Sequence, residues 1–228
     1  MKTLSNVLNT IEGTEPQRTE FTFDALPDAK SAKTGVSVEY AYDPNKSWYV
    51  FRASHGREDK AFDIIVEDGT YCYIPKRYVK KIVQGKLRKK TETLIPNLLF
   101  VYTTQADADR YIKETPALDF LSYYYNHFRL IAGKNPPLLI PQEEMFKLIQ
   151  TTRSMNEHLL LVKHGECKFR NGDTVKVKEG LFTGVEGRVA RLSGQQRVIV
   201  SISNIGMIAT AYIPSAFLQV IGNNDTSK

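Results

Sequence analysis

The sequence predicts an α+β fold in two parts: an α/β sandwich with a mostly antiparallel sheet, then a small β-barrel. Between residues 46 and 152, strand-like and helix-like segments follow one another in the order β-α-β-β-α-β-α. Between residues 168 and 221, short runs of alternating apolar residues are separated by glycines, as the tight corners of a small barrel require. A chain of 228 residues with 42% hydrophobic residues has room for both domains.

The N-terminal stretch differs from the rest of the chain in charge and composition. Residues 1–45 are polar and turn-rich, so we expect a partly disordered extension with one short helix at residues 4–11. Residues 1–44 hold four Lys/Arg and seven Asp/Glu, a net charge of −3, which leaves 27 basic and 18 acidic residues, or +9, in the remainder. This basic excess favours contact with nucleic acid or with an acidic protein surface.

The first half of the sandwich begins with an aromatic and β-branched run at residues 47–52, which predicts a strand. Gly56 ends this strand, and residues 57–67 then place apolar side chains at helical spacing. A second strand is expected at residues 70–75. Residues 76–90 follow as a basic segment, with eight basic and no acidic side chains in fifteen positions.

The second half of the sandwich repeats this alternation. A strand interrupted by a Pro-Asn pair is expected over residues 94–102, a helix over 106–113 and a long aromatic strand over 120–131. A third helix opens at Pro141, because proline and acidic side chains favour the first helical turn. Its predicted apolar face consists of Met145, Leu148, Ile149 and Thr152.

The barrel is predicted from dense β signals after residue 168. Val175/Val177 and Val185/Val189 alternate with polar residues, and glycines 180, 184 and 187 punctuate the connection between them. Alternation continues at Val198, Val200, Ile202 and Tyr212. The predicted division of the chain is an extension at 1–45, the sandwich at 46–152, a linker at 153–167, the barrel at 168–221 and a tail at 222–228.

The pattern G-D-x-V-x-V-x-x-G-x-F-x-G-x-x-G-x-V over residues 172–189 resembles the KOW motif of NusG-type transcription factors and several ribosomal proteins. An unrelated β-hairpin is the alternative. Before this motif come a W-Y-V start at Trp48, a helix, a strand ending in Ile74-Pro75, a basic hairpin and an aromatic-aliphatic strand after a proline. In this order the chain resembles the NusG family over about residues 47–221. The resemblance implies an NGN-like N-terminal domain and an SH3-like KOW barrel.

Within that family, the chain looks most similar to the specialised RfaH and UpxY-type antiterminators. Residues 96–101 read P-N-L-L-F-V, similar to the P-N-Y-L-F-V of RfaH, whereas housekeeping NusG carries Pro-Gly-Tyr. Residues 82–86 resemble the I-V-R-G-K of RfaH, and residues 210–217 resemble the UpxY ending. The resemblance implies an antitermination factor that acts on certain operons, such as capsular polysaccharide operons. A housekeeping NusG and a ribosome-associated KOW protein that binds RNA are the alternatives.

In this family the N-terminal domain lays a hydrophobic depression against the clamp helices of the largest RNA polymerase subunit. The resemblance places this surface at Tyr49, Phe51, Pro96, Asn97, Leu98 and Phe100. Leu98 and Phe100 are favoured, because the Pro-Asn pair bends the chain where the strand begins. Since alternate residues of a strand face the core, burial of half of these side chains is the competing interpretation.

Two basic groups are candidate nucleic-acid contacts. Arg52, His55, Arg57 and Lys60 match the positions with which RfaH reads the non-template DNA strand, and we expect them on one exposed face. The hairpin suits upstream DNA or nascent RNA through Lys80, Lys81, Lys86, Arg88, Lys89 and Lys90. A solvated helix start and a charged edge that prevents aggregation are the respective alternatives.

For the barrel, the resemblance implies recruitment of Rho or of the ribosomal protein that couples translation to transcription. The expected exposed apolar contacts are Phe182, Ile202, Ile205, Met207 and Ile208. The corresponding domain of RfaH can also fold as a helical hairpin. Glycines in the first half and Pro214 disfavour helices here, so we expect a five-stranded barrel, flexibly connected to the first domain.

Enzyme chemistry is not expected, because the chain has no H-E-x-x-H, G-x-S-x-G or Walker-type motif. Cys72 and Cys167 are too few for a disulfide framework, and His164 beside Cys167 gives two ligands where structural zinc needs four. We therefore expect no cofactor and no metal. No apolar run approaches the ~20 residues of a membrane span and no secretory signal is recognisable, so a monomeric cytoplasmic protein is expected.

Overall fold

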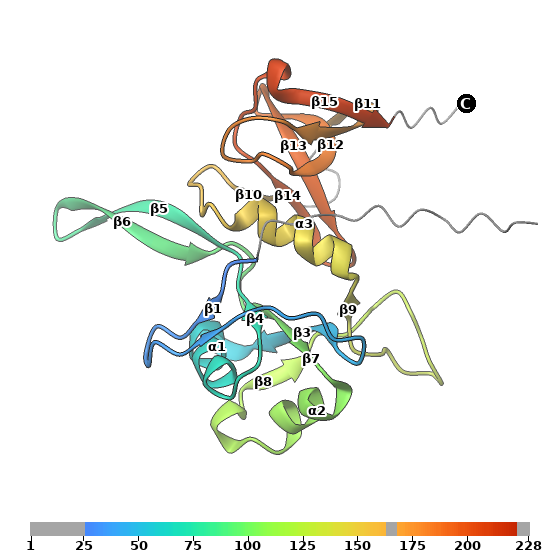
Figure 1. Cartoon of the computed structure of the whole chain (residues 1–228). Helices are drawn as coiled ribbons and strands as arrows, with labels where there is room; N and C mark the ends of the chain where they lie inside the picture. Colours follow the sequence, from blue (N-terminus) through green and yellow to red (C-terminus); the bar gives the residue numbers. More distant parts are fainter. Residues whose placement is uncertain (1–25, 163–167, 223–228) are drawn as a thin grey trace, which may run out of the picture.

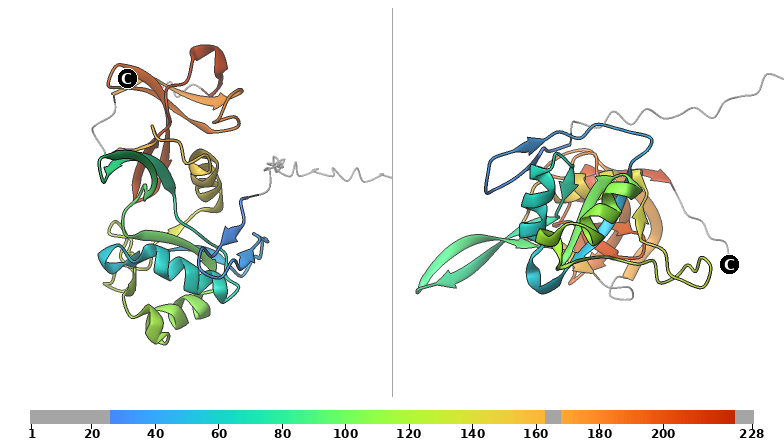
Figure 2. Two further views of the ribbon diagram at one scale, coloured as in Figure 1. Left: turned by 90° about the vertical axis from the view of Figure 1, so that its left-hand side faces the viewer. Right: turned by 90° about the horizontal axis from the view of Figure 1, so that it is seen from below.

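The computed structural model describes residues 26–162 and 168–222, with the backbone alone for residues 168–173. Figures 1 and 2 show an α/β domain at one end and a β domain at the other, with helix α3 (Gln142–Thr152) between them. The predicted α+β architecture is confirmed. The remaining helices are α1 (Glu58–Glu67), α2 (Gln105–Lys113) and the short 3-10 turns η1 (Ser54–Gly56), η2 (Pro116–Leu118) and η3 (Ser215–Phe217). None of the helices in the described ranges is long and apolar enough to cross a bilayer.

The N-terminal domain is built on an antiparallel sheet in the order β4-β7-β3-β8, with β9 also paired to β3. These strands are β3 (Ser47–Ala53), β4 (Cys72–Tyr73), β7 (Leu98–Thr103), β8 (Leu121–Tyr123) and β9 (Leu139–Ile140). The central pair runs from Ser47 opposite Thr103 to Arg52 opposite Leu98. Every residue of β7 is buried, as expected for a strand covered on both faces.

The two faces of this sheet are covered by different helices. Tyr49 and Phe51 point to the face of α1 and α2: the Tyr49 hydroxyl donates to the Gln105 side chain over 2.9 Å. Cys72 lies on this face too, with its thiol 3.8 Å from the Phe62 carbonyl oxygen of α1. The opposite face carries Trp48, Val50, Phe100 and Tyr102 in paired positions. Helix α3 lies on that side, where Tyr73 and Thr152 share a hydroxyl–hydroxyl bond of 2.7 Å.

Helix α3 is buried on two sides. The predicted apolar face is confirmed, because Met145, Leu148, Ile149 and Thr152 are all fully buried. On the barrel side, the Glu144 carboxylate accepts bonds of 2.7 and 2.6 Å from the backbone N–H and hydroxyl of Ser203. The Gln150 amide donates to the Thr183 carbonyl over 3.2 Å. The helix therefore joins the two domains through one continuous apolar core.

The C-terminal domain is a single antiparallel sheet in the order β10-β14-β13-β12-β11-β15. Its strands are β10 (Leu160–Val162), β11 (Lys168–Val177), β12 (Glu186–Leu192), β13 (Gln195–Ile202), β14 (Gly206–Ala209) and β15 (Leu218–Gly222). The alternating β pattern is confirmed, but a sixth strand was not expected. Strand β10 comes from the predicted linker and pairs with β14, with Leu161 opposite Ile208. The flexible connection is thus wrong for residues 153–162, whose apolar side chains Leu159 and Val162 are buried.

Part of the predicted N-terminal extension is packed on the sheet. Strands β1 (Ala29–Lys30) and β2 (Ser37–Val38) form a hairpin. Tyr40 stacks on Trp48 at 6.0 Å between ring centroids and meets the Phe146 ring of α3 edge-on at 5.5 Å. Within the extension predicted to be partly disordered, residues 26–45 are therefore ordered, and aromatic packing at Tyr40 holds them. The helix expected at residues 4–11 lies outside the described residues.

The long aromatic strand expected over residues 120–131 is also corrected. Strand β8 ends at Tyr123, and the following residues form a loop in which Phe128 is 84% exposed. The Asn135 amide donates to the carbonyl oxygens of Asn126 (2.7 Å) and Arg129 (3.1 Å), which closes the loop. Local side-chain bonds and Gly133, with φ 78°, replace the expected strand ladder.

Candidate functional site

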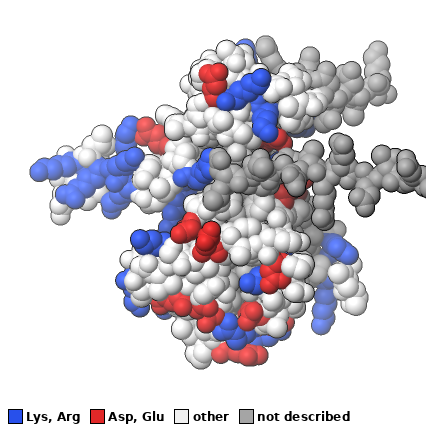
Figure 3. All heavy atoms as spheres, viewed as in Figure 1, with Lys and Arg blue, Asp and Glu red and all other residues white. Residues whose placement is uncertain are grey.

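The basic hairpin consists of β5 (Lys76–Val83) and β6 (Lys86–Thr93), which project from the body of the molecule (Figures 1 and 2). The strands pair without interruption up to Val83 opposite Lys86. Gln84 and Gly85 close the turn with φ values of 51° and 69°, the two positive φ angles of a type I′ hairpin. Figure 3 shows the Lys and Arg side chains gathered along this arm. All six predicted cations of the hairpin are exposed: Lys80, Lys81, Lys86, Arg88, Lys89 and Lys90.

These cations fall into two groups by their partners. Lys80 pairs with Glu157 at 3.0 Å, Lys81 pairs with Glu92 at 3.3 Å, and the Lys89 ammonium lies 3.5 Å from the centre of the Tyr78 ring. The other three make no ion pair with any residue of the ranges 26–162 and 168–222. Lys86, Arg88 and Lys90 are therefore available to bind phosphates.

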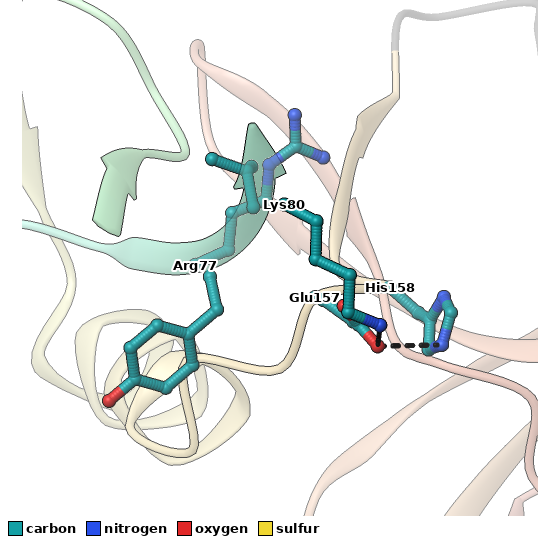
Figure 4. Close-up of a pocket in the computed structure, with 6 residues that line it drawn as sticks. Arg77, Lys80, Glu157 and His158 are labelled. Atoms are coloured by element: carbon teal, nitrogen blue, oxygen red, sulfur yellow. Dashed lines mark hydrogen bonds and ion pairs between the residues drawn. The ribbon is translucent and has the colours of Figure 1, made fainter. Parts of the chain in front are cut away.

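The base of the hairpin is fastened to the segment that leads into the barrel (Figure 4). The Arg77 guanidinium donates to the Leu159 carbonyl over 2.8 Å, and the Tyr78 backbone N–H donates to the Met155 carbonyl over 2.8 Å. The bond from Lys80 lowers the pKa of the Glu157 carboxyl. These anchors were missed from sequence, since they join residues about eighty positions apart and no local pattern marks them.

The first basic group is only partly brought together. The Arg57 guanidinium lies 4.1 Å from the centre of the Phe120 ring, and the Lys60 ammonium lies 5.2 Å from it. His55 is exposed in η1 with φ 60°. Arg52, however, is paired with Leu98 and Ser122 and so points to the sheet face opposite α1. The expectation of one shared face is therefore wrong for Arg52, and Phe120 is an organising residue that sequence reasoning missed.

Asn97 connects the Pro-Asn turn to the loop that carries His55. Its side-chain oxygen accepts a 3.0 Å bond from the Gly56 backbone N–H, and its carbonyl accepts a 2.8 Å bond from the Ala53 N–H. Asn97 itself has φ 63°, a left-handed conformation that asparagine and glycine tolerate better than other residues. Asn97 thus fixes the shape of this corner of the domain.

We expect Asn97→Ala to destabilise the N-terminal domain by about 2 kcal/mol, because it removes a hydrogen bond and forces alanine into a left-handed conformation. Asn97→Gly is the matched control: it loses the same bond but tolerates the backbone angle, and should cost about 1 kcal/mol. Urea unfolding followed by the fluorescence of Trp48, the single tryptophan, measures both. Equal losses for the two variants would show that the backbone angle contributes nothing.

The predicted polymerase surface is not a single exposed patch. Four of its six residues are buried: Tyr49 is 4% exposed, Leu98 is 7% exposed, and Phe51 and Phe100 are fully buried. Tyr49 and Phe51 face α1 and α2, whereas Leu98 and Phe100 lie on the opposite face of the sheet. The expected common surface is therefore wrong, because β3 and β7 are central strands covered on both sides. Pro96 is exposed and Asn97 half-exposed in the turn between β6 and β7.

The apolar residues predicted to be exposed on the barrel are also mostly internal. Four of them are buried and the fifth is half-buried: Phe182, Ile202, Met207 and Ile208, then Ile205. The predicted exposure is wrong: Ile202, Met207 and Ile208 lie on β13 and β14, inner strands of the six-stranded sheet, and Phe182 belongs to the hydrophobic core. The apolar side chains that do face solvent on this domain include Leu181, Tyr212 and Val220.

The described residues offer little for covalent or metal chemistry. Burial raises the pKa of the Cys72 thiol well above its usual value, so it stays protonated and unreactive at neutral pH. No cluster of three or more His, Cys, Asp or Glu side chains with metal-site geometry occurs in the described part of the chain. His164 and Cys167 lie outside it.

Residues 46–149, from the start of β3 to near the end of α3, match a family model described as transcription termination factor NusG. No curated protein matches the chain. The matched range covers the sheet of the N-terminal domain, the basic hairpin, helices α1 and α2, and most of α3. Residues 46–149 are therefore similar to the NusG family of transcription factors over a little less than half of the chain.

Proposed function

We propose that this protein binds RNA polymerase during elongation and promotes antitermination at particular operons, such as capsular polysaccharide operons. The observation that supports this most is the NusG family match over residues 46–149. The P-N-L-L-F-V run at residues 96–101 favours a specialised antiterminator over a housekeeping NusG. The protein would act as a cytoplasmic monomer, with neither cofactor nor metal.

The proposed polymerase contact is centred on the turn at Pro96 and Asn97, which is accessible as it stands. Contact by Leu98 or Phe100 would require the groups that cover this face of the sheet to move, since both side chains are buried. An exposed turn next to a largely apolar strand suits docking on a helical protein surface. Arg52 and His55, exposed beside this turn, would then lie close to the non-template DNA strand.

The hairpin is proposed to contact nucleic acid near the polymerase, and the barrel to recruit a further factor. Lys86, Arg88 and Lys90 are exposed and without ion-pair partners among the described residues, which favours phosphate contacts. For the barrel, a ribosomal protein or Rho remains the proposed partner. The solvent-facing Leu181 and Tyr212 are better candidates for that contact than the buried Ile202 or Ile208.

Binding to assembled elongation complexes tests the proposal directly. The labelled full chain is mixed with RNA polymerase on a DNA–RNA scaffold, or with ribosomal particles, and binding is followed by native gel. We expect association with the elongation complex and a loss of at least about tenfold in affinity for Pro96→Glu. Leu181→Glu, an equally exposed substitution on the barrel, is the control and should bind polymerase normally.

Two outcomes would favour the alternatives. Binding to ribosomal particles but not to elongation complexes would overturn the proposal in favour of a ribosome-associated KOW protein that binds RNA. If the protein binds polymerase, transcription through a terminator behind different leader sequences separates the two remaining possibilities. Read-through on one leader alone is the result expected of an operon-specific antiterminator, whereas equal effects on all leaders indicate a general factor.

A further inference from the structure

The tip of the basic hairpin carries an exposed apolar pair. Ile82 is 75% exposed and Leu87 is 67% exposed, and the two residues lie directly opposite each other in the β5–β6 register. Directly paired residues of an antiparallel ribbon project from the same face. Two large aliphatic side chains therefore stand side by side in water at the far end of an arm that otherwise carries charges.

We propose that Ile82 and Leu87 form a wedge that inserts between neighbouring base pairs of duplex DNA and bends the duplex. The cations of the arm hold the phosphates on either side. The inference deepens the proposed contact of the hairpin with nucleic acid and rests on it. Apolar wedges of this kind unstack base steps in the minor groove, and the energy lost is recovered from additional contacts to the bent DNA.

The distribution of charge around the wedge fits a DNA groove. By strand alternation, Lys80 and Lys89 lie on the wedge face, whereas Lys81 and Arg88 lie on the opposite face. Cations on both faces put positive charge within reach of both strands that border a groove. Lys80–Lys89 and Lys81–Arg88 are also directly opposed pairs of like charges, an arrangement that destabilises a hairpin. Glu157 and Glu92 offset part of this repulsion through Lys80 and Lys81. Binding a polyanion relieves the rest.

Duplex DNA fits this arm better than RNA or a single strand. A two-stranded β-ribbon can enter a DNA groove, whereas the major groove of A-form RNA is too narrow for side chains to read. Proteins that bind single strands depend on aromatic side chains for stacking. The only aromatic residue of the arm, Tyr78, has one face taken by the Lys89 ammonium at 3.5 Å.

Insertion of a wedge into DNA requires an arm whose base is fixed to the rest of the protein, and several contacts fix it here. The Tyr78 N–H and Arg77 guanidinium are bonded to the carbonyls of Met155 and Leu159, each over 2.8 Å. Lys80 adds the ion pair with Glu157. Because these three contacts, at Arg77, Tyr78 and Lys80, fix the start of the ribbon, force applied at its tip is transmitted to the body of the protein.

The test uses the full chain and a duplex of about 25 base pairs, short enough that it does not bend appreciably by itself. The duplex carries a fluorophore pair at its ends and 2-aminopurine at a central TA step, which unstacks readily. Wild type should increase energy transfer between the ends and raise 2-aminopurine fluorescence. Ile82→Ala/Leu87→Ala should lose most of both signals and bind about tenfold more weakly. Its salt dependence should be unchanged, since no phosphate contact is removed.

Leu130→Ala/Ile131→Ala removes two comparably exposed apolar side chains, 68% and 51% exposed, from the loop after β8 and should behave as wild type. Duplex binding without bending or unstacking by the wild type would overturn the wedge, as would equal affinity for either separated single strand. The double hairpin variant is also tested on elongation complexes without upstream duplex. If the variant binds these complexes normally, polymerase binding does not depend on the wedge, and the proposed function stands whatever the DNA result. If binding is lost, the tip of the hairpin docks on protein and the wedge is overturned.

Discussion

Phe100→Asp is expected to unfold the N-terminal domain. Phe100 is fully buried between Val50 and Tyr73 in the middle of the sheet. Removing a buried phenyl ring costs about 3–5 kcal/mol, and an unpaired carboxylate at the same place costs several more. That total is comparable to the whole stability of a typical domain. We expect a variant that is largely unfolded at room temperature, with the fluorescence of Trp48 shifted to that of a solvated indole.

Ile82→Asp is the matched control, because it introduces the same charge at a side chain that is 75% exposed. It should change the free energy of unfolding by no more than about 0.5 kcal/mol. Trp48 reports well on this domain, since it is 1% exposed and packed against Tyr40 and Tyr102. A folded Phe100→Asp protein with reduced polymerase affinity would contradict the burial described here and return Phe100 to the interface.

The elements that could be predicted from sequence are those whose local pattern agrees with their packing. The run Ser47–Ala53 is aromatic and β-branched throughout, and it forms the central strand β3. Helix α3 was predicted from Pro141 and its apolar spacing, and its predicted face is buried. The basic hairpin was expected from the resemblance to the NusG family. The exposure of its Lys and Arg side chains could be predicted from their chemistry, because such side chains cannot be buried without partners.

The errors arise where partners distant in sequence decide the outcome. Residues 120–131 have strand-like composition, but β8 ends at Tyr123 because only Leu121–Tyr123 find a partner in β3. Residues 160–162 have no special pattern beyond three apolar side chains, and the free edge of β14 makes them a strand. Tyr40 was assigned to a disordered extension because its order depends on the aromatic cluster around Trp48.

The candidate site shows the same distinction between features set by a residue's own chemistry and features set by distant partners. Exposure of a cation could be predicted from its own chemistry, and all six hairpin cations are exposed. Exposure of an apolar side chain depends on what covers it. Phe100 and Ile202 were assigned to binding surfaces by resemblance, yet both are buried. Ile82 and Leu87, which are exposed, were not singled out because their strand alternates little between charged and apolar residues.

The second large effect is expected at Gly187, the third glycine of the turn-rich segment that first indicated a barrel. Gly187 lies on β12, paired with Val175 of β11. A Cβ at this position would overlap the carbonyl oxygen of Ile199 and lie 2.8 Å from Cγ1 of Val198, both on the neighbouring strand β13. Backbone cannot yield as a flexible side chain can, so Gly187→Ala should destabilise the C-terminal domain by about 3 kcal/mol.

Gly222→Ala is the control, because the nearest atom to its new Cβ would be Cβ of Thr174 at 4.0 Å, an ordinary contact. Amide hydrogen exchange of Arg197 and Ile199 measures the effect where the strain would act, because alternate N–H groups of β13 face β12 and that of Val198 is bonded to Thr210 on the other side. We expect exchange at these two amides to be faster by about two orders of magnitude in Gly187→Ala and unchanged in Gly222→Ala. Equal protection in both variants would mean that β12 and β13 can separate without cost. The close approach of these strands would then not be the reason for a glycine at this position.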